Sequence, residues 1–390
     1  MDRNNYNILI IIFFPYLYLF PHTFQFIEMG NDFELLYFSY KKYIFEFINI
    51  GHLPLWSPSE SLGYSLIFNP FAQYLYPLSW VLYLIAFILG DLSKHIFLLY
   101  TIFGISIYGV GQYLWLKKLN ISQKNALIST IIVCASLKLT ETLRFPNAIH
   151  TFCWFPWILY GITLSIEKKA VLKPIIIIFF STLFVLTAGY PYYIIYAVFF
   201  LNFQISNSEN SILFEFIWNE VDLIKNIRAF GRINILLLPL IAVIICFAIK
   251  NFSKTIYPKN FIKIIVIISS IILLLQFYII EIINYNSIYW ETWQGKRLNY
   301  ASNNLGVFGF IFELYNNYIY SIFTVASIIT LVLIIKYNYL KNLNLIILLL
   351  IIGELFILSN IQWAIPYKYY DANGYNKLED KPLQKLRNSF

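Results

Sequence analysis

The chain has 390 residues, of which 59% are hydrophobic and only 12% are charged. Soluble domains carry roughly 25% charged residues, so this composition excludes a soluble globular domain with a hydrophobic core. The formal net charge of +8 does not indicate nucleic-acid binding, because the basic residues lie in short loops between apolar blocks. These blocks are about twenty residues long, the length that crosses a ~30 Å hydrocarbon core. We therefore predict an all-α polytopic membrane protein.

The apolar blocks predict the membrane spans. They cover residues 7–26, 95–116, 125–143, 150–166, 174–190, 233–250, 263–285, 317–335 and 343–361. Two further stretches are ambiguous, because 72–90 contains Pro77 and 191–204 is too short to cross comfortably. Both are interpreted as re-entrant or interfacial segments, which leaves about 9–11 transmembrane helices. The first block could instead be a signal peptide, but no small-residue cleavage site follows it.

The basic residues predict the orientation. With the N-terminus inside, the inner segments are 1–6, 117–124, 167–173, 250–263 and 336–342. They hold 13 of the 28 basic residues but only two acids, Asp2 and Glu167. Because Lys and Arg concentrate in cytoplasmic loops, we expect a multi-pass protein of the plasma (inner) membrane with a cytoplasmic N-terminus. Lys225, Arg228 and Arg232 fall outside in this arrangement unless 191–204 crosses.

Residues 1–361 are expected to form a single transmembrane domain, followed by a short outer tail at 362–390. The first outer loop covers 27–94, and within it residues 33–50 have an amphipathic pattern. Its polar face would hold Glu34, Ser39, Lys41, Lys42, Glu46 and Asn49. This pattern predicts an interfacial helix that lies flat in the headgroup layer. A turn-rich segment, 51–58 (GHLPLWSP), follows.

Several loop motifs resemble one known family. They are Asp32 in the first outer loop, the segment 51–58, Asn69-Pro70, Tyr76-Pro77, the run 145–150 (FPNAIH), the run 154–157 (WFPW) and the turn 188–191 (AGYP), in which Tyr190 stands where His is usual. In this order they resemble the YfhO family of bacterial membrane proteins. That family is similar to GT-C-type glycosyltransferases, which use polyprenyl-phosphate-linked sugars. Family members are usually longer, so the end at Phe390 is consistent with a truncated member.

The resemblance implies a GT-C-like fold with Asp32 as the catalytic residue at the acceptor. An inverting transfer needs a carboxylate to take the proton of the acceptor hydroxyl while the lipid phosphate leaves. The competing interpretation is structural, because Asn31 or Asp32 could cap the helix that follows. Glu34 is interpreted as part of a solvated helix face.

The departing phosphate needs positive charge, and the substrate needs binding residues. The candidates are His52, Trp56, Arg144, His150, Lys296 and Arg297. Each has a simpler interpretation: the histidines as polar loop residues, and the basic side chains as contacts to lipid headgroups. Lys138 and Glu141 form an i,i+3 pair near an outer span end, where mutual pairing accounts for both charges.

The cofactor is left open, with a divalent metal one candidate, although no His/Asp/Glu cluster has metal-ligand spacing. The expected partners are membrane lipids and a polyprenyl-phosphate-linked sugar, and no nucleic acid. Two alternatives to a glycosyltransferase of the cell envelope stay open. One is a transporter or flippase of a lipid-linked saccharide, which would place charges or broken helices at mid-membrane. The other is a non-catalytic membrane fragment.

Overall fold

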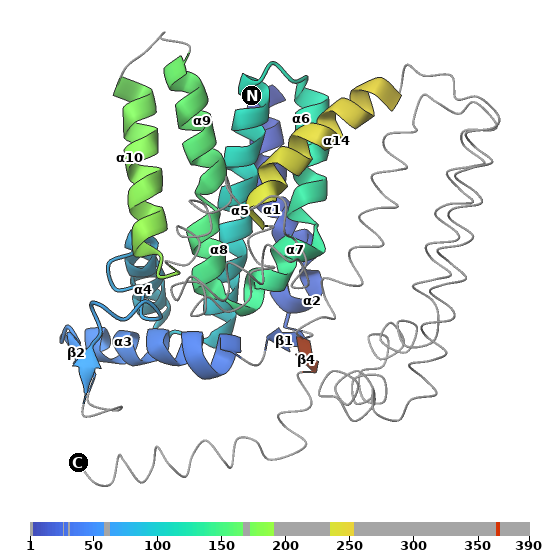
Figure 1. The fold of residues 1–390 in the computed structure, drawn as a ribbon. Coiled ribbons are helices and arrows are strands. Elements are labelled where there is room, and N and C mark those ends of the chain that lie inside the picture. Colours follow the sequence, from blue (N-terminus) through green and yellow to red (C-terminus); the bar gives the residue numbers. More distant parts are fainter. Residues whose placement is uncertain are drawn as a thin grey trace, which may run out of the picture. The chain divides into compact units, whose positions relative to one another are not determined.

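The computed structural model describes residues 3–25, 27–29, 32–57, 63–166, 172–190, 235–252 and 364–366. This part of the chain is mostly helical, and Figure 1 shows its elements. Two helices, Lys94–Lys118 and Pro146–Ile166, are long and apolar enough to cross a membrane, and a bent helix pair could supply a third. The predicted spans 263–285, 317–335 and 343–361, and the stretch 191–204, lie outside the described residues.

The chain divides into two compact units. The first contains Met1–Tyr18 and Asn31–Ala248, and the second contains Leu19–Gly30 and Ile249–Phe390. In the second unit, the described elements are α2 (Phe20–Thr23) and an antiparallel pair formed by β1 (Ile27–Met29) and β4 (Ala364–Pro366). All other elements below belong wholly or largely to the first unit.

Helix α5 (Lys94–Lys118) lies at the centre of the first unit. It packs against α1 (Arg3–Tyr18), α6 (Gln123–Cys134), α8 (Pro146–Phe152) and α9 (Phe155–Ile166). Glycines on α5 let these neighbours approach closely: a Cβ on Gly109 would lie 2.7 Å from Ile11, and one on Gly111 would lie 2.5 Å from Trp157. Small residues at helix contacts are typical of membrane bundles. Helix α10 (Leu172–Thr187) packs on α9.

The predicted spans agree with the helices to different degrees. The span at 95–116 is confirmed as α5, and the span at 150–166 begins earlier, at Pro146. The block 174–190 is the 16-residue α10, and the block 233–250 contains α14 (Leu238–Phe252). The block 7–26 is not one helix, because α1 ends at Tyr18. Pro21 stands at the start of α2, where a proline favours a new first helical turn.

The remaining two blocks are broken or short. In the block 125–143, α6 ends at Cys134, and the chain continues through α7 (Leu137–Thr140) and the 3-10 turn η2 (Glu141–Arg144) after a bend of 51°. In the ambiguous block 72–90, α4 (Pro77–Leu89) has 13 residues, about 20 Å at 1.5 Å each. Gly90 ends α4 in the left-handed conformation, with φ +86°.

The first-loop helix is confirmed as two consecutive pieces. A six-residue π-helix, η1 (Phe33–Phe38), leads directly into α3 (Ser39–Asn49). Figure 1 shows α3 running across the end of the bundle helices rather than alongside them. Contacts with α4, α5 and α8 hold η1 and α3 in this position. The orientation suits a helix in the membrane plane, which stays a prediction.

Two residues on the predicted polar face are not solvated. Glu34 is buried and forms an ion pair with Lys94, and Lys41 is completely buried. The prediction was wrong for both because it treated this helix as lying on a flat surface, with no protein packed against the face of Glu34 and Lys41. The end of the bundle then covers these polar side chains and supplies partners for them.

The lysine-containing last turn of α5 and the first-loop helix lie at opposite ends of the first unit. Lys117 and Lys118 are in the last turn of α5, while η1 contacts this helix near its beginning. The start of α1 lies at the lysine end, because Lys117 Nζ donates a hydrogen bond to Asn4 Oδ1 at 2.7 Å. The N-terminus and the end of α5 therefore lie on the same side of the bundle, as the predicted topology requires.

Candidate functional site

Three motif turns that are far apart in the sequence meet at the end of the bundle. Asn147 Nδ2 donates to the carbonyl oxygens of Pro70 and Phe71, at 2.7 and 3.2 Å. Gln73 Nε2 donates to the carbonyl oxygen of Ala188 at 2.5 Å. The Asn69-Pro70, FPNAIH and AGYP motifs are therefore joined directly through two buried amide side chains.

Gly189 makes this close approach possible. Its φ of +84° lies in the left-handed region, and a Cβ at this position would stand 1.9 Å from the carbonyl oxygen of Pro70. The same Cβ would lie 3.0 Å from Asn147 Nδ2 and 3.0 Å from Gln73 Cγ. Only glycine combines this backbone conformation with this lack of space. The AGYP turn thus needs its glycine to contact the other two turns.

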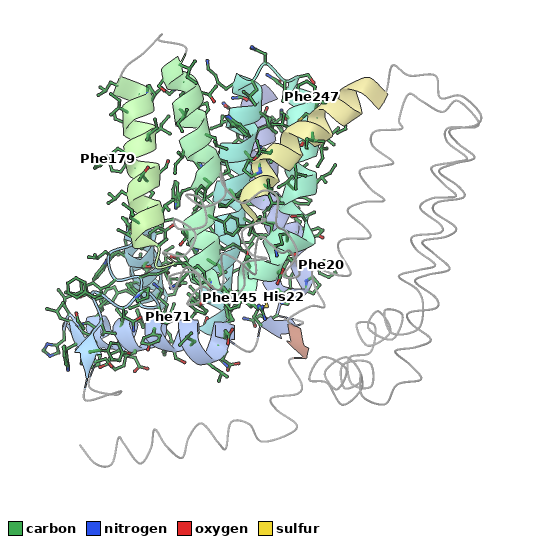
Figure 2. The ribbon with its side chains drawn as sticks, viewed as in Figure 1. Phe20, His22, Phe71, Phe145, Phe179 and Phe247 are labelled. Carbon is green, nitrogen blue, oxygen red and sulfur yellow. The ribbon has the colours of Figure 1, made fainter. Side chains whose placement is uncertain are left out.

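An aromatic cluster connects these turns to the first-loop helix. The ring of Tyr37 in η1 packs edge-on against Phe71 and Phe145, with centroids 5.6 and 6.3 Å apart, and Tyr40 in α3 stacks on Phe71 at 6.2 Å. Phe71 and Phe145 are labelled beside α3 in Figure 2. Such aromatic pairs contribute ~0.5–1.5 kcal/mol each beyond burial. The helix that follows Asp32 is therefore fixed against the motif turns.

His150 lies in a buried chain of hydrogen bonds. Its Nε2 is 3.1 Å from the carbonyl oxygen of Tyr100, which can only accept, so Nε2 carries hydrogen. Its Nδ1 then accepts from the Tyr76 hydroxyl at 3.3 Å, and that hydroxyl accepts from Trp154 Nε1 at 3.0 Å. The imidazole also stacks on the Tyr100 ring, with centroids 4.1 Å apart.

These contacts correct the simpler interpretation of His150 as a polar loop residue, because it is a buried residue of α8. Both ring nitrogens have protein partners, so neither is available to a ligand in this arrangement. Trp154 and Tyr76, which belong to two further motifs, hold the ring in place. His150 therefore joins the motifs rather than lining an open site.

Lys41 is a buried cation close to the hydrogen-bond chain of His150. The sequence pattern did not identify it as a candidate site residue. Its Nζ donates to the carbonyl oxygen of Ala72 at 2.9 Å and to Ser79 Oγ at 2.7 Å. Ser79 Oγ lies 3.5 Å from the Tyr100 hydroxyl, which links Lys41 to the His150 chain. Burial lowers the pKa of the Lys41 ammonium well below its ordinary value.

The sequence does contain a signal for Lys41. Tyr37, Lys41, Ile44 and Phe45 follow the helical spacing of one face, and all four are buried. A lysine within an otherwise apolar stripe indicates either a buried partner or a long side chain that reaches solvent. Among the described residues, no carboxylate forms an ion pair with Lys41, and its partners are a hydroxyl and a carbonyl. Neither partner type leaves a recognisable pattern in the sequence.

Asp32 is partly exposed immediately before η1. Its own backbone is helical, with φ −55° and ψ −32°, and its side chain makes no capping hydrogen bond. The cap interpretation is therefore wrong for Asp32, while Asn31 lies outside the described residues. Arg144 stands beside the same aromatic cluster: its guanidinium lies 4.4 Å from the centre of the Phe145 ring and 4.0 Å from Glu141.

The predicted Lys138–Glu141 pair is confirmed, with Nζ 3.5 Å from Oε2. Of the other candidate residues, His52 is exposed in the turn after α3, and Trp56 is exposed in a short hairpin. Lys296 and Arg297 lie outside the described residues. The structure thus brings Asp32, Arg144 and His150 to one end of the bundle and places His52 and Trp56 at exposed positions beyond the end of α3.

The described residues do not fit a metal site. No group of three or more His, Cys, Asp or Glu side chains within them could hold an ion. Among the described candidates, Asp32 could take up a proton as a carboxylate, and Arg144 could stabilise negative charge.

Comparisons with known proteins add no relative: no family model, no curated protein and no solved structure matches the chain. The resemblance to the YfhO family therefore depends on the loop motifs themselves.

Proposed function

We propose that the chain is a GT-C-like glycosyltransferase of the cell envelope. It transfers a sugar from a polyprenyl-phosphate donor to an envelope polymer or lipid at the outer face of the membrane. The observation that supports this proposal is the direct contact between the motif turns through Asn147 and Gln73. Residues 70, 147 and 188 are far apart in the sequence, so local structure does not bring them together. Their contact beside η1 therefore favours a common site.

The proposed chemistry uses Asp32 as the general base. Its carboxylate takes the proton of an acceptor hydroxyl while the acceptor oxygen attacks C1 of the sugar. The bond from C1 to the phosphate oxygen breaks, and polyprenyl phosphate leaves with the bonding electron pair. Positive charge from Arg144 would stabilise the departing phosphate. The π-helix after Asp32 supports this role, because π-helical turns are rare and often occur at functional sites.

The test is a transfer assay with the full chain reconstituted in liposomes. The donors are undecaprenyl-phosphate hexoses with a radiolabelled sugar, and the acceptors are envelope fractions of the producing cells. Loss of a general base costs ~10²–10⁴-fold in rate, so Asp32→Asn should transfer at least ~100-fold more slowly than the wild type. Glu46→Gln, which changes an exposed carboxylate of α3, is the matched control. Near-normal transfer by Asp32→Asn would exclude the catalytic assignment.

One observation favours the second candidate, a flippase of a lipid-linked saccharide. The bent pair formed by α6 and the segment Lys138–Arg144 is a discontinuous helix whose second piece carries charges. Broken helices with charged residues line the binding sites of many transporters. Movement of intact labelled lipid-linked sugar between leaflets, without transfer, would support this candidate over the first.

A further inference from the structure

A short hairpin beyond the end of α3 exposes large apolar side chains. Strand β2 (Trp56–Ser57) pairs with β3 (Tyr64–Ser65), and the amide of Leu66 donates to the carbonyl of Leu55 at 2.9 Å. The exposed apolar residues of this region are Ile50, Leu53, Leu55, Trp56 and Phe68. We call the described residues 50–57 and 63–68 the apolar hairpin. They include no Lys, Arg, Asp or Glu, and His52 is their one basic residue.

The Trp56 side chain is held in place by the opposite strand of the hairpin. A Cβ on Gly63 would lie 2.3 Å from Trp56 Nε1, so the indole rests directly against the Gly63 backbone. Although it is packed on this side, Trp56 remains 56% exposed, and Phe68 is 84% exposed. Exposing a contiguous apolar surface to water is unfavourable, and such a surface usually marks an interaction site.

The position of the hairpin indicates what it contacts. Figure 1 shows β2 at the far end of α3, on the side of the bundle where α4 and α10 lie. The outward faces of those two helices are also apolar, with Leu84, Ile88, Phe179 and Phe180 exposed. Exposed apolar side chains therefore occur on the hairpin and on two bundle helices that lie on the same side of the first unit. A bilayer around the candidate spans would meet this surface at the level of α3.

We propose that the apolar hairpin inserts into the headgroup–acyl boundary of the bilayer and anchors the outer end of α3 there. Tryptophan, leucine and phenylalanine are side chains that favour this boundary. Lys42 and Glu46, on the preceding turns of α3, would remain on the aqueous side. The inference concerns a lipid surface, so it holds whether or not the chain transfers sugar.

Site-directed spin labelling tests the proposal with the full chain in liposomes of phosphatidylcholine and phosphatidylglycerol. Nitroxides are attached in turn to Leu53→Cys, Phe68→Cys and, as a control on α3, Glu46→Cys. The described native cysteines, Cys134, Cys153 and Cys246, are buried and give little background. Collision with oxygen, which concentrates in lipid, is compared with collision with a water-soluble nickel chelate.

We expect the oxygen-to-nickel collision ratio to be several-fold higher at Leu53 and Phe68 than at Glu46. A ratio equal to that at Glu46 would place the hairpin in water and overturn the proposal. Low collision with both reagents would also overturn it, because protein, from this chain or a second copy, would then cover the hairpin. Because all three positions are exposed, the substitutions should leave folding intact, and equal thermal unfolding of the labelled variants checks this.

Discussion

Lys41 Nζ donates a hydrogen bond to Ser79 Oγ at 2.7 Å, and both side chains are completely buried. This bond fastens the first-loop helix α3 to α4, while the bond to Ala72 fastens it to the loop between the Asn69-Pro70 and Tyr76-Pro77 motifs. A buried ammonium with neutral acceptors is held at an electrostatic cost, since desolvation favours its uncharged form. The stability of this junction between α3 and α4 should therefore depend on pH.

The first prediction concerns the stability of the folded chain against pH. Burial lowers the pKa of Lys41, so the folded state binds fewer protons than the unfolded state between that lowered pKa and 10.5. Stability should rise with pH across this window and fall as pH decreases through it, by up to about 1.4 kcal/mol per pH unit. Thermal unfolding followed by tryptophan fluorescence measures the slope. Lys41→Met should flatten it, whereas Lys42→Met, at a partly exposed position, should not. Equal slopes in all three proteins would contradict the prediction.

The second prediction is an asymmetry between the partners of a buried ion pair. Glu34 is buried, with 5% of its side chain exposed, whereas Lys94 is 35% exposed. Lys94→Met removes a cation from a buried carboxylate, which typically costs ~3–5 kcal/mol. Glu34→Gln leaves an ammonium that water can reach, so its cost should be nearer 1 kcal/mol.

Denaturant unfolding in detergent measures both variants, and the double variant serves as the control. Combining Glu34→Gln with Lys94→Met should recover part of the stability that Lys94→Met loses, because the buried carboxylate is then gone. Equal losses in the two single variants would show that burial of Glu34 does not decide the energy of this pair.

The third prediction compares two glycines with almost the same backbone conformation. Gly189 and Gly90 have φ of +84° and +86°, but a Cβ on Gly90 would meet no atom within 4 Å. Gly90→Ala should therefore lower the free energy of unfolding only by the cost of holding alanine in the left-handed conformation, ~1–2 kcal/mol. Gly189→Ala must also displace the Pro70 carbonyl and should cost at least about 2 kcal/mol more. Similar unfolding temperatures for the two variants would disprove the close contact of the motif turns.

Hydrophobic pattern predicted well the parts of the fold in which apolar length alone decides the structure. The span 95–116 is confirmed, because α5 is an uninterrupted apolar helix. The Ser93 side chain caps its beginning. The same pattern missed the ends of α1 and α6. The sequence does carry signs of both breaks, because Pro21 and His22 interrupt the first block and Lys138 and Glu141 follow the bend after Cys134. The prediction weighed only the total apolar length of each block.

The candidate site was less predictable, because its contacts join residues that are distant in the sequence. Asp32, Arg144 and His150 were proposed from motifs, but a motif does not state that His150 would be buried with both nitrogens occupied. Lys41 and Ser79 belong to no motif. Their pairing depends on how α3 crosses the bundle, and that is a property of packing rather than of local sequence.

The last prediction concerns the sidedness of the membrane. Lys117, Lys118, Lys124 and Lys173 lie at or near helix ends on the side opposite η1 and α3, and basic loops are retained in the cytoplasm. We therefore expect Gln123 to face the cytoplasm and Asn49 to face outward. Both are exposed, so Gln123→Cys and Asn49→Cys are suited to an impermeant thiol reagent. In intact cells only Asn49→Cys should react, and Gln123→Cys should react after permeabilisation. The wild-type chain provides the background. Labelling of Gln123→Cys but not Asn49→Cys in intact cells would invert the topology and put Asp32 on the cytoplasmic side, where a donor at the outer face could not reach it.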